Sequence, residues 1–127
     1  MFGTAHTFSG FSSNAVEESL RFYRDTLGLR AEEAMGGFRL KFAGGGEVFV
    51  YPKENHEPAT FTVLNFRVAD VDAAVAELNA RGVVTKIYAD DEFRTDERGI
   101  ARGDGYGPDI AWFRDPAGNV LSVLAES

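Results

Sequence analysis

The sequence contains no cysteine, only two histidines and fewer basic than acidic residues. Without thiols the chain cannot form disulfides, use a cysteine nucleophile, or bind zinc or an iron–sulfur cluster through sulfur. Its 20 Asp and Glu outnumber its 13 Lys and Arg. Because the resulting net charge of −7 repels phosphate backbones, we expect no nucleic acid partner.

Long hydrophobic runs are also missing, since no stretch approaches the ~18 consecutive apolar residues of a membrane span. Residues 1–6 show no basic region followed by an apolar run, which a secretory signal would need. We therefore expect no membrane partner and a cytoplasmic location.

The sequence is instead rich in apolar and aromatic side chains. Of its 127 residues, 44% are hydrophobic and 11 are Phe. This length is typical of one compact domain with a sizeable core. The excess of Phe must either fill that core or line a binding surface.

Two segments, 14–27 and 71–81, have the spacing of amphipathic helices, with apolar residues recurring every three or four positions. Asn14 and Asp70 are suited to cap the two helix starts, and a glycine follows each predicted helix, as at many helix ends. The inward-facing positions are Val16, Leu20, Tyr23 and Leu27 in the first helix and Val71, Val75 and Leu78 in the second.

The strand pattern indicates a duplication. Superposing Phe11 on Phe66 aligns Val16 with Val71, so each half reads as a strand, a helix and three strands. We predict an α+β fold of two tandem βαβββ modules, about 5–53 and about 60–125, within a single domain of residues 1–127. The strands expected from apolar runs are 8–13, 38–42, 47–51, 61–68, 83–88, 110–114 and 120–124.

Three motifs carry a resemblance to a known family. They are Phe22-Tyr23 followed by Leu27-Gly28, then Val68-x-Asp70-Val71, and Phe113-x-Asp115-Pro116-x-Gly118-Asn119. Together they resemble the vicinal oxygen chelate superfamily, which includes glyoxalase I, bleomycin-resistance proteins and extradiol dioxygenases. The resemblance implies a mixed sheet curled around a cleft, a homodimer, and one divalent metal held by side chains on four strands, where it acts as a Lewis acid.

The metal positions that the resemblance implies do not carry metal ligands. Counting from the family's landmarks places them at Phe8, near Val50, at Val63 and at Ser122. A divalent metal needs imidazole, carboxylate or thiolate there, so we predict neither a metal site nor a cofactor. His6 is expected near a frayed end and His56 in a surface loop. A displaced metal site that uses either histidine stays open as an alternative.

A cleft floor without metal ligands suits flat, hydrophobic ligands. Alternation along a strand places Asn65 and Arg67 on the same face as Phe61 and Val63, although Arg67 could instead pair with an acidic residue for structure alone. The apolar members could simply pack across a filled sheet. The long segment 89–109 contains aromatic residues that a free linker would not need. The residues predicted to bind the ligand are Phe8, Phe38, Phe42, Val50, Phe61, Val63, Asn65, Arg67, Phe93, Tyr106, Trp112 and Ser122.

These features favour a metal-free binding protein that sequesters an aromatic or hydrophobic natural product or drug, as bleomycin-resistance proteins do. We predict no catalytic residue, because the sequence shows neither an acid/base carboxylate pair nor a nucleophile motif. The alternatives are a lyase, isomerase or dioxygenase with a displaced metal site, a metal-free enzyme, and a subunit that only dimerises.

Overall fold

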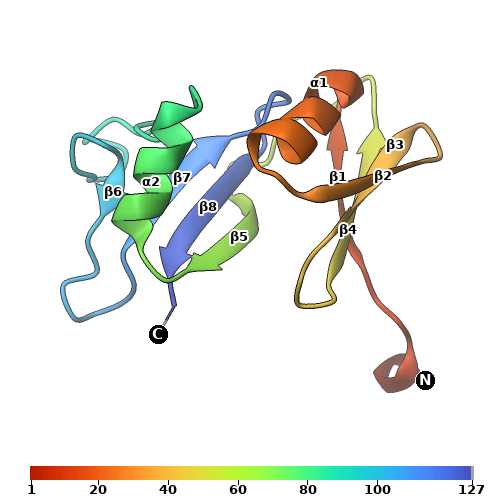
Figure 1. Cartoon of the computed structure of the whole chain (residues 1–127), viewed down its shortest axis with the longest axis horizontal. Coiled ribbons are helices and arrows are strands. Elements are labelled where there is room, and N and C mark those ends of the chain that lie inside the picture. Colours follow the sequence, from red (N-terminus) through yellow and green to blue (C-terminus); the bar gives the residue numbers. More distant parts are fainter. Residues whose placement is uncertain (127) are drawn as a thin grey trace. The chain divides into compact units, whose positions relative to one another are not determined.

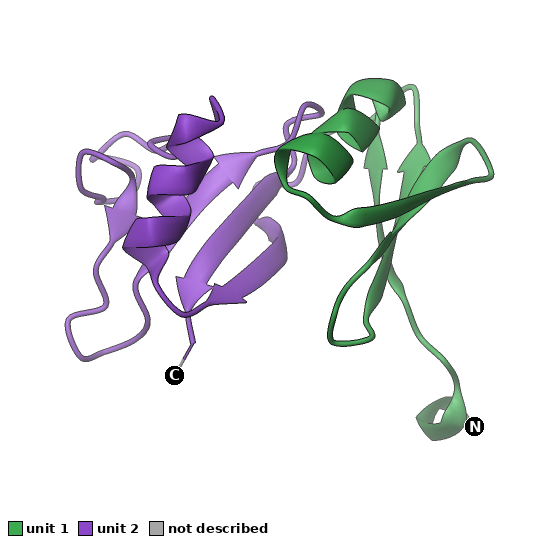
Figure 2. Ribbon diagram, in the orientation of Figure 1, with its two compact units in different colours: residues 1–57 green, residues 58–127 purple. Residues whose placement is uncertain are grey.

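The computed structural model describes residues 1–126 (Figure 1). Figure 2 shows the two compact units into which the chain divides, residues 1–57 and residues 58 onward. Each unit contains one four-stranded sheet and one α-helix of its own. No helix in residues 1–126 is long and apolar enough to cross a membrane.

The first unit follows the order strand, helix, three strands. Its elements are β1 (Ser9–Ser13), α1 (Val16–Arg21), β2 (Arg30–Ala34), β3 (Gly37–Lys41) and β4 (Glu47–Pro52), with a short 3-10 turn, Phe2–Thr4, before them. The sheet order is β1-β4-β3-β2. The first strand is parallel to β4, and the other neighbours are antiparallel.

The first helix begins later than the sequence predicted. Ala15 is its N-cap residue, and no side chain caps it, so Asn14 does not have the predicted role. The buried Ser13 hydroxyl instead accepts a hydrogen bond from the Ala15 amide at 2.9 Å. The same hydroxyl lies 2.9 Å from that of Ser19, which ties the helix to the end of β1.

The first helix also ends differently, because it widens into a π-helical turn at Phe22–Thr26 instead of continuing as a regular helix. Tyr23 lies in this turn and is fully buried. Its ring packs against those of Phe11 and Phe38, with centroids 6.2 Å and 6.0 Å away. The Phe-Tyr pair of the motif therefore anchors the helix to its sheet.

The second unit repeats this topology. Its elements are β5 (Thr62–Val68), α2 (Val71–Ala80), β6 (Ile100–Ala101), β7 (Ile110–Arg114) and β8 (Val120–Ala125). The order β5-β8-β7-β6 again places the first strand beside the last, in parallel. Asp70 caps α2 as predicted, since its side chain accepts a hydrogen bond from the Ala73 amide. The predicted pair of βαβββ modules is therefore confirmed.

One predicted strand, 83–88, does not form, and β6 takes its place at the edge of β7. The segment is held by side chains instead of a sheet ladder: Asn79 donates to the Val83 carbonyl, and the Thr85 hydroxyl donates to the Arg98 carbonyl at 2.6 Å. Gly99 fits against this backbone, because a Cβ at Gly99 would lie 1.9 Å from the Thr85 carbonyl oxygen.

Each sheet has a core face that packs against its helix and an opposite face, which we term the open face. Side chains alternate between the two faces along every strand. Figure 1 shows α2 lying across β7 and β8, which it contacts. Buried core-face residues are Phe11, Phe38, Leu40, Val48 and Val50 in the first sheet and Ala111, Phe113, Leu121 and Val123 in the second.

Candidate ligand-binding faces

A polar and aromatic row crosses the open face of the second unit. Asn65 on β5, Ser122 on β8 and Trp112 on β7 are direct neighbours in the strand register. The Ser122 hydroxyl donates a hydrogen bond to the Asn65 side-chain oxygen at 2.5 Å and is itself fully buried. This bond orients the Asn65 amide, whose nitrogen donates to no residue within 1–126.

Trp112 is half-exposed, and two other aromatic rings pack against it. The Phe93 ring lies 4.8 Å from it and the Tyr88 ring 5.5 Å, both in edge-to-face geometry. The predicted site residues Phe93 and Trp112 are thus brought together. Tyr88 was not among the predicted site residues, because the sequence pattern assigned it to the end of the strand 83–88, which does not form. The three rings, which we term the aromatic cluster, offer both faces and edges for stacking.

Arg67 occupies the next row of the same open face, beside Leu124. It lies two positions after Asn65, which is about 7 Å along the strand. Arg67 is exposed, and its side chain forms no hydrogen bond or ion pair with residues 1–126. The structural pairing that was one possible role for Arg67 is therefore not seen in this part of the chain, and its guanidinium faces solvent.

The two apolar residues predicted for β5 do not continue that face. A bulge lies between Thr62 and Leu64, and Thr62 pairs with Val120, in the row that alternation assigned to Val63. Phe61 precedes the strand and is 68% exposed. The extra residue in the bulge explains why simple alternation failed here.

Tyr106 is not brought to the aromatic cluster. It lies in the loop before β7, is 98% exposed, and makes no ring contact with residues 1–126. Its amide donates to the Gly103 carbonyl, which closes a turn. We therefore leave Tyr106 out of the candidate site.

The open face of the first unit contains a hollow of about 250 Å³. Phe8 enters it from the segment before β1 and is 66% exposed, as its predicted site role requires. The remaining lining residues, Met35, Arg39, Glu47 and Phe49, were not predicted. Alternation along 38–42 and 47–51 would have identified Arg39 and Phe49, since each neighbours a core residue.

Phe38 and Val50 lie on the core face, so their predicted place in the ligand site is corrected. Both are fully buried, and they face each other across β3 and β4 beneath Tyr23. The count from the family's landmarks, which placed a ligand position near Val50, was off by one residue, and one residue changes the face of a strand. The open-face residue in that part of β4 is Phe49, which pairs with Gly10 and Arg39.

Phe42 lies just beyond β3 and is half-buried. Its amide donates to the Gly46 carbonyl at 3.1 Å, which closes the turn between β3 and β4. It continues the alternation of Phe38 and Leu40, which places it on the core-face side of the sheet. Its contact with a ligand stays a prediction.

The long segment 89–109 is tied to α2 by ion pairs. Asp72 on α2 bonds both Arg98 and Arg102, and Arg102 also reaches Asp96 and Asp109. The hydrogen bond from Arg102 is the main reason that the pKa of Asp72 falls to about 2, with a smaller contribution from Arg98. This network, together with the pairing of β6 and β7, ties the segment 89–109 to the rest of the second unit.

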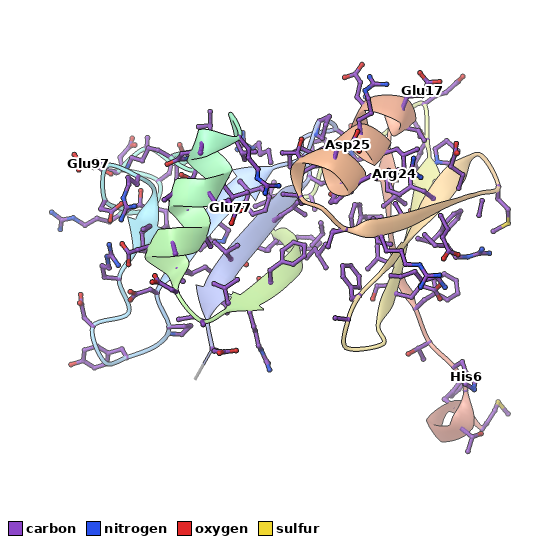
Figure 3. All side chains as sticks on the ribbon, viewed as in Figure 1. His6, Glu17, Arg24, Asp25, Glu77 and Glu97 are labelled. Carbon is purple, nitrogen blue, oxygen red and sulfur yellow. The ribbon has the colours of Figure 1, made fainter. Side chains whose placement is uncertain are left out.

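The side chains present do not fit the metal that the family resemblance implies. The implied positions Phe8, Val63 and Ser122, with Val50 or its open-face neighbour Phe49, offer rings, alkyl groups and one hydroxyl. A divalent ion needs imidazole or carboxylate donors in a cysteine-free chain. His6 is exposed on the segment between the first turn and β1 (Figure 3). His56 lies 2.6 Å from the Ser12 hydroxyl. No three His, Asp or Glu side chains in residues 1–126 are grouped to hold an ion.

Several solved structures are similar to this chain over nearly its whole length. The chain is similar to a solved glyoxalase family protein from Enterococcus faecalis, with 18% identity and a TM-score of 0.71 over 98% of this chain and 99% of the other. It is also similar to lactoylglutathione lyase from Agrobacterium tumefaciens, with 18% identity and a TM-score of 0.66 over 96% of this chain and 93% of the other. A third similar structure is TnmS3, an antibiotic binding protein from Streptomyces sp. CB03234, with 22% identity and a TM-score of 0.64 over 98% of each chain. No curated protein matches the chain.

These solved structures share the fold, and at such low identities they carry no assignment of ligand or reaction. The family model of the Glyoxalase/Bleomycin resistance protein/Dioxygenase superfamily matches residues 5–123, which confirms the resemblance read from the three motifs. With nearly the whole sequence matched, and the βαβββ topology present twice, the chain belongs to the glyoxalase/bleomycin resistance protein/dioxygenase superfamily.

Proposed function

We propose that the chain is a metal-free binding protein that sequesters a small aromatic ligand on the open face of its second unit. The observation that carries the proposal is the half-exposed Trp112, flanked by Tyr88 and Phe93 and lying in one row with Asn65 and Ser122. Aromatic walls with a few placed polar groups are typical of small-molecule sites.

Each part of this face has a distinct role in the proposal. The aromatic cluster supplies stacking area, and its edge-to-face rings suit a planar partner. Asn65, oriented by Ser122, supplies an amide donor beside the rings. Arg67 supplies a positive charge one row away. None of these groups is an activated nucleophile or general base, so we infer affinity without turnover.

The comparisons are compatible with binding and with catalysis, since the similar structures include an antibiotic binding protein as well as a lyase. The donor chemistry favours binding for this chain. Where an enzyme of this family would need metal ligands, the open faces present aromatic rings, an amide and a hydroxyl. We infer that the bound compound is a natural product or drug, held so that it cannot reach its target.

Trp112 is the only tryptophan in the chain, so its fluorescence reports directly on this face. We expect planar polycyclic compounds, such as anthracycline and naphthoquinone antibiotics, to quench it saturably and to raise the melting temperature. Substituting Trp112→Ala should weaken binding at least tenfold by calorimetry, whereas Trp112→Phe should retain part of the affinity.

An exposed aromatic residue outside the cluster provides the matched control. Tyr106→Ala should leave the affinity unchanged, because this ring contacts none of the cluster. If no compound in the panel shifts either signal, or if Trp112→Ala binds as tightly as the native chain, the proposed function is wrong.

A further inference from the structure

We propose that the hollow on the open face of the first unit is a second binding site, and that its ligand is a small aromatic carboxylate paired with Arg39. The hollow belongs to residues 1–57 alone and uses none of the residues of the aromatic cluster. The inference therefore does not depend on the proposed function of the second unit.

Arg39 is half-buried, and the two carboxylates beside it are paired with other cations. Its strand neighbour Glu32 bonds Arg30 at 2.7 Å, and Glu47 in the hollow bonds Lys41. The lowered pKa of Glu47 comes first from that Lys41 hydrogen bond, with the charge of Arg39 as the smallest contribution.

The Arg39 side chain makes no hydrogen bond or ion pair with residues 1–126. Acidic residues outnumber basic ones 20 to 13, so a half-buried arginine without a carboxylate is unusual in this chain. Its guanidinium has a planar fork of donors that matches a carboxylate in a bidentate pair. An external anion can supply that carboxylate.

The walls of the hollow determine which kind of acid fits. Phe8 and Phe49 provide two rings, and the exposed Met35 adds a polarizable thioether. Its volume of about 250 Å³ is smaller than most drug-sized pockets and suits one or two fused rings. Glu47 and the net charge of −7 disfavour a dianion such as a phosphate.

The probe for this site is 1-naphthoate, titrated into the full chain by calorimetry, with neutral 1-naphthamide as the isosteric comparison. We expect the carboxylate to bind at least tenfold more tightly than the amide. Arg39→Gln should abolish that preference, and Arg39→Lys should keep part of it because the charge remains while the fork is lost. Arg21→Gln, which removes an exposed charge on α1, is the matched control and should change nothing.

Equal affinity for naphthoate and naphthamide, or an unchanged preference in Arg39→Gln, would overturn the inference. If Arg39→Gln does not fold, Phe8→Ala decides, since Phe8 is exposed and precedes the first strand. Unchanged naphthoate affinity in Phe8→Ala would then refute the site. Loss of naphthoate binding in Trp112→Ala but not in Arg39→Gln would place the acid on the second unit, leaving the proposed function intact and this inference wrong.

Discussion

At the residue scale, Asp115 in the turn between β7 and β8 shows how one buried carboxylate satisfies several donors. One of its oxygens accepts hydrogen bonds from the amides of Ala117 and Asn119, and the other accepts from the Asn119 side chain, all at 2.9 Å. Asp115 is only 5% exposed. The family motif at this turn therefore has a structural cause, because the carboxylate satisfies donors that water cannot reach.

Replacing this carboxylate should destabilise the protein. Asp115→Ala removes the carboxylate that accepts from two buried backbone amides, and we expect a loss of about 3 kcal/mol in the free energy of unfolding, measured by urea denaturation. Asp91→Ala, an exposed carboxylate in the long loop, should cost less than about 0.5 kcal/mol. A loss below about 1 kcal/mol for Asp115→Ala would contradict this account of the turn.

At the element scale, ion pairs tie the segment between α2 and β7 to the helix, in addition to the short pairing of β6 with β7. Arg102 bonds three carboxylates, of which Asp72 belongs to α2. The aromatic cluster depends on this segment, because it carries Phe93. Loss of the ion pairs should therefore loosen the wall of the candidate site before the core unfolds.

The pH dependence follows from Asp72, whose pKa is lowered from 3.8 to about 2 chiefly by the hydrogen bond from Arg102. A lowered pKa means that the ionised form stabilises the fold, so this contribution is fully present above pH 3.8 and is lost as the pH falls through 2. We expect urea denaturation of the native chain to show a steeper loss of stability between pH 4 and pH 2 than Asp72→Asn shows.

Asp91→Asn removes a carboxylate outside the network and serves as the control for this comparison. Its stability should fall with pH as steeply as that of the native chain. Identical pH slopes for the native chain and Asp72→Asn would show that the ion pairs contribute nothing to stability.

At the scale of the whole molecule, two expectations concern metal content and assembly. The open faces lack a suitable donor set, and we therefore predict substoichiometric metal in protein purified without chelators, measured by elemental analysis. One equivalent of nickel, zinc or iron per chain, with affinity reduced by His56→Ala, would instead favour the displaced metal site.

The second expectation concerns assembly. The resemblance implies a homodimer, and light scattering should give about twice the 13.9 kDa mass of the chain. A monomer that still binds aromatic compounds would show that the site does not need a partner copy. A dimer without any binding would favour the alternative in which the chain only dimerises.

Much of the fold could be predicted from sequence because both modules keep the spacing of apolar residues that is typical of their helices and strands. The alternation that identified Phe11 and Phe113 as core residues also placed Asn65 and Arg67 on the opposite face. The segment 83–88 could not be resolved in this way, since its apolar pattern is typical of a strand but Asn79 satisfies its polar groups from the helix.

The sequence by itself determined the two βαβββ modules and the residue types at the family's metal positions, because both depend on order along the chain. Only the tertiary structure decided that Phe49 faces the open side while Val50 is buried, since a one-residue offset reverses the face of a strand. It alone also brought Tyr88 and Phe93 onto Trp112, because these rings come from different segments of the chain whose pairing no local pattern encodes.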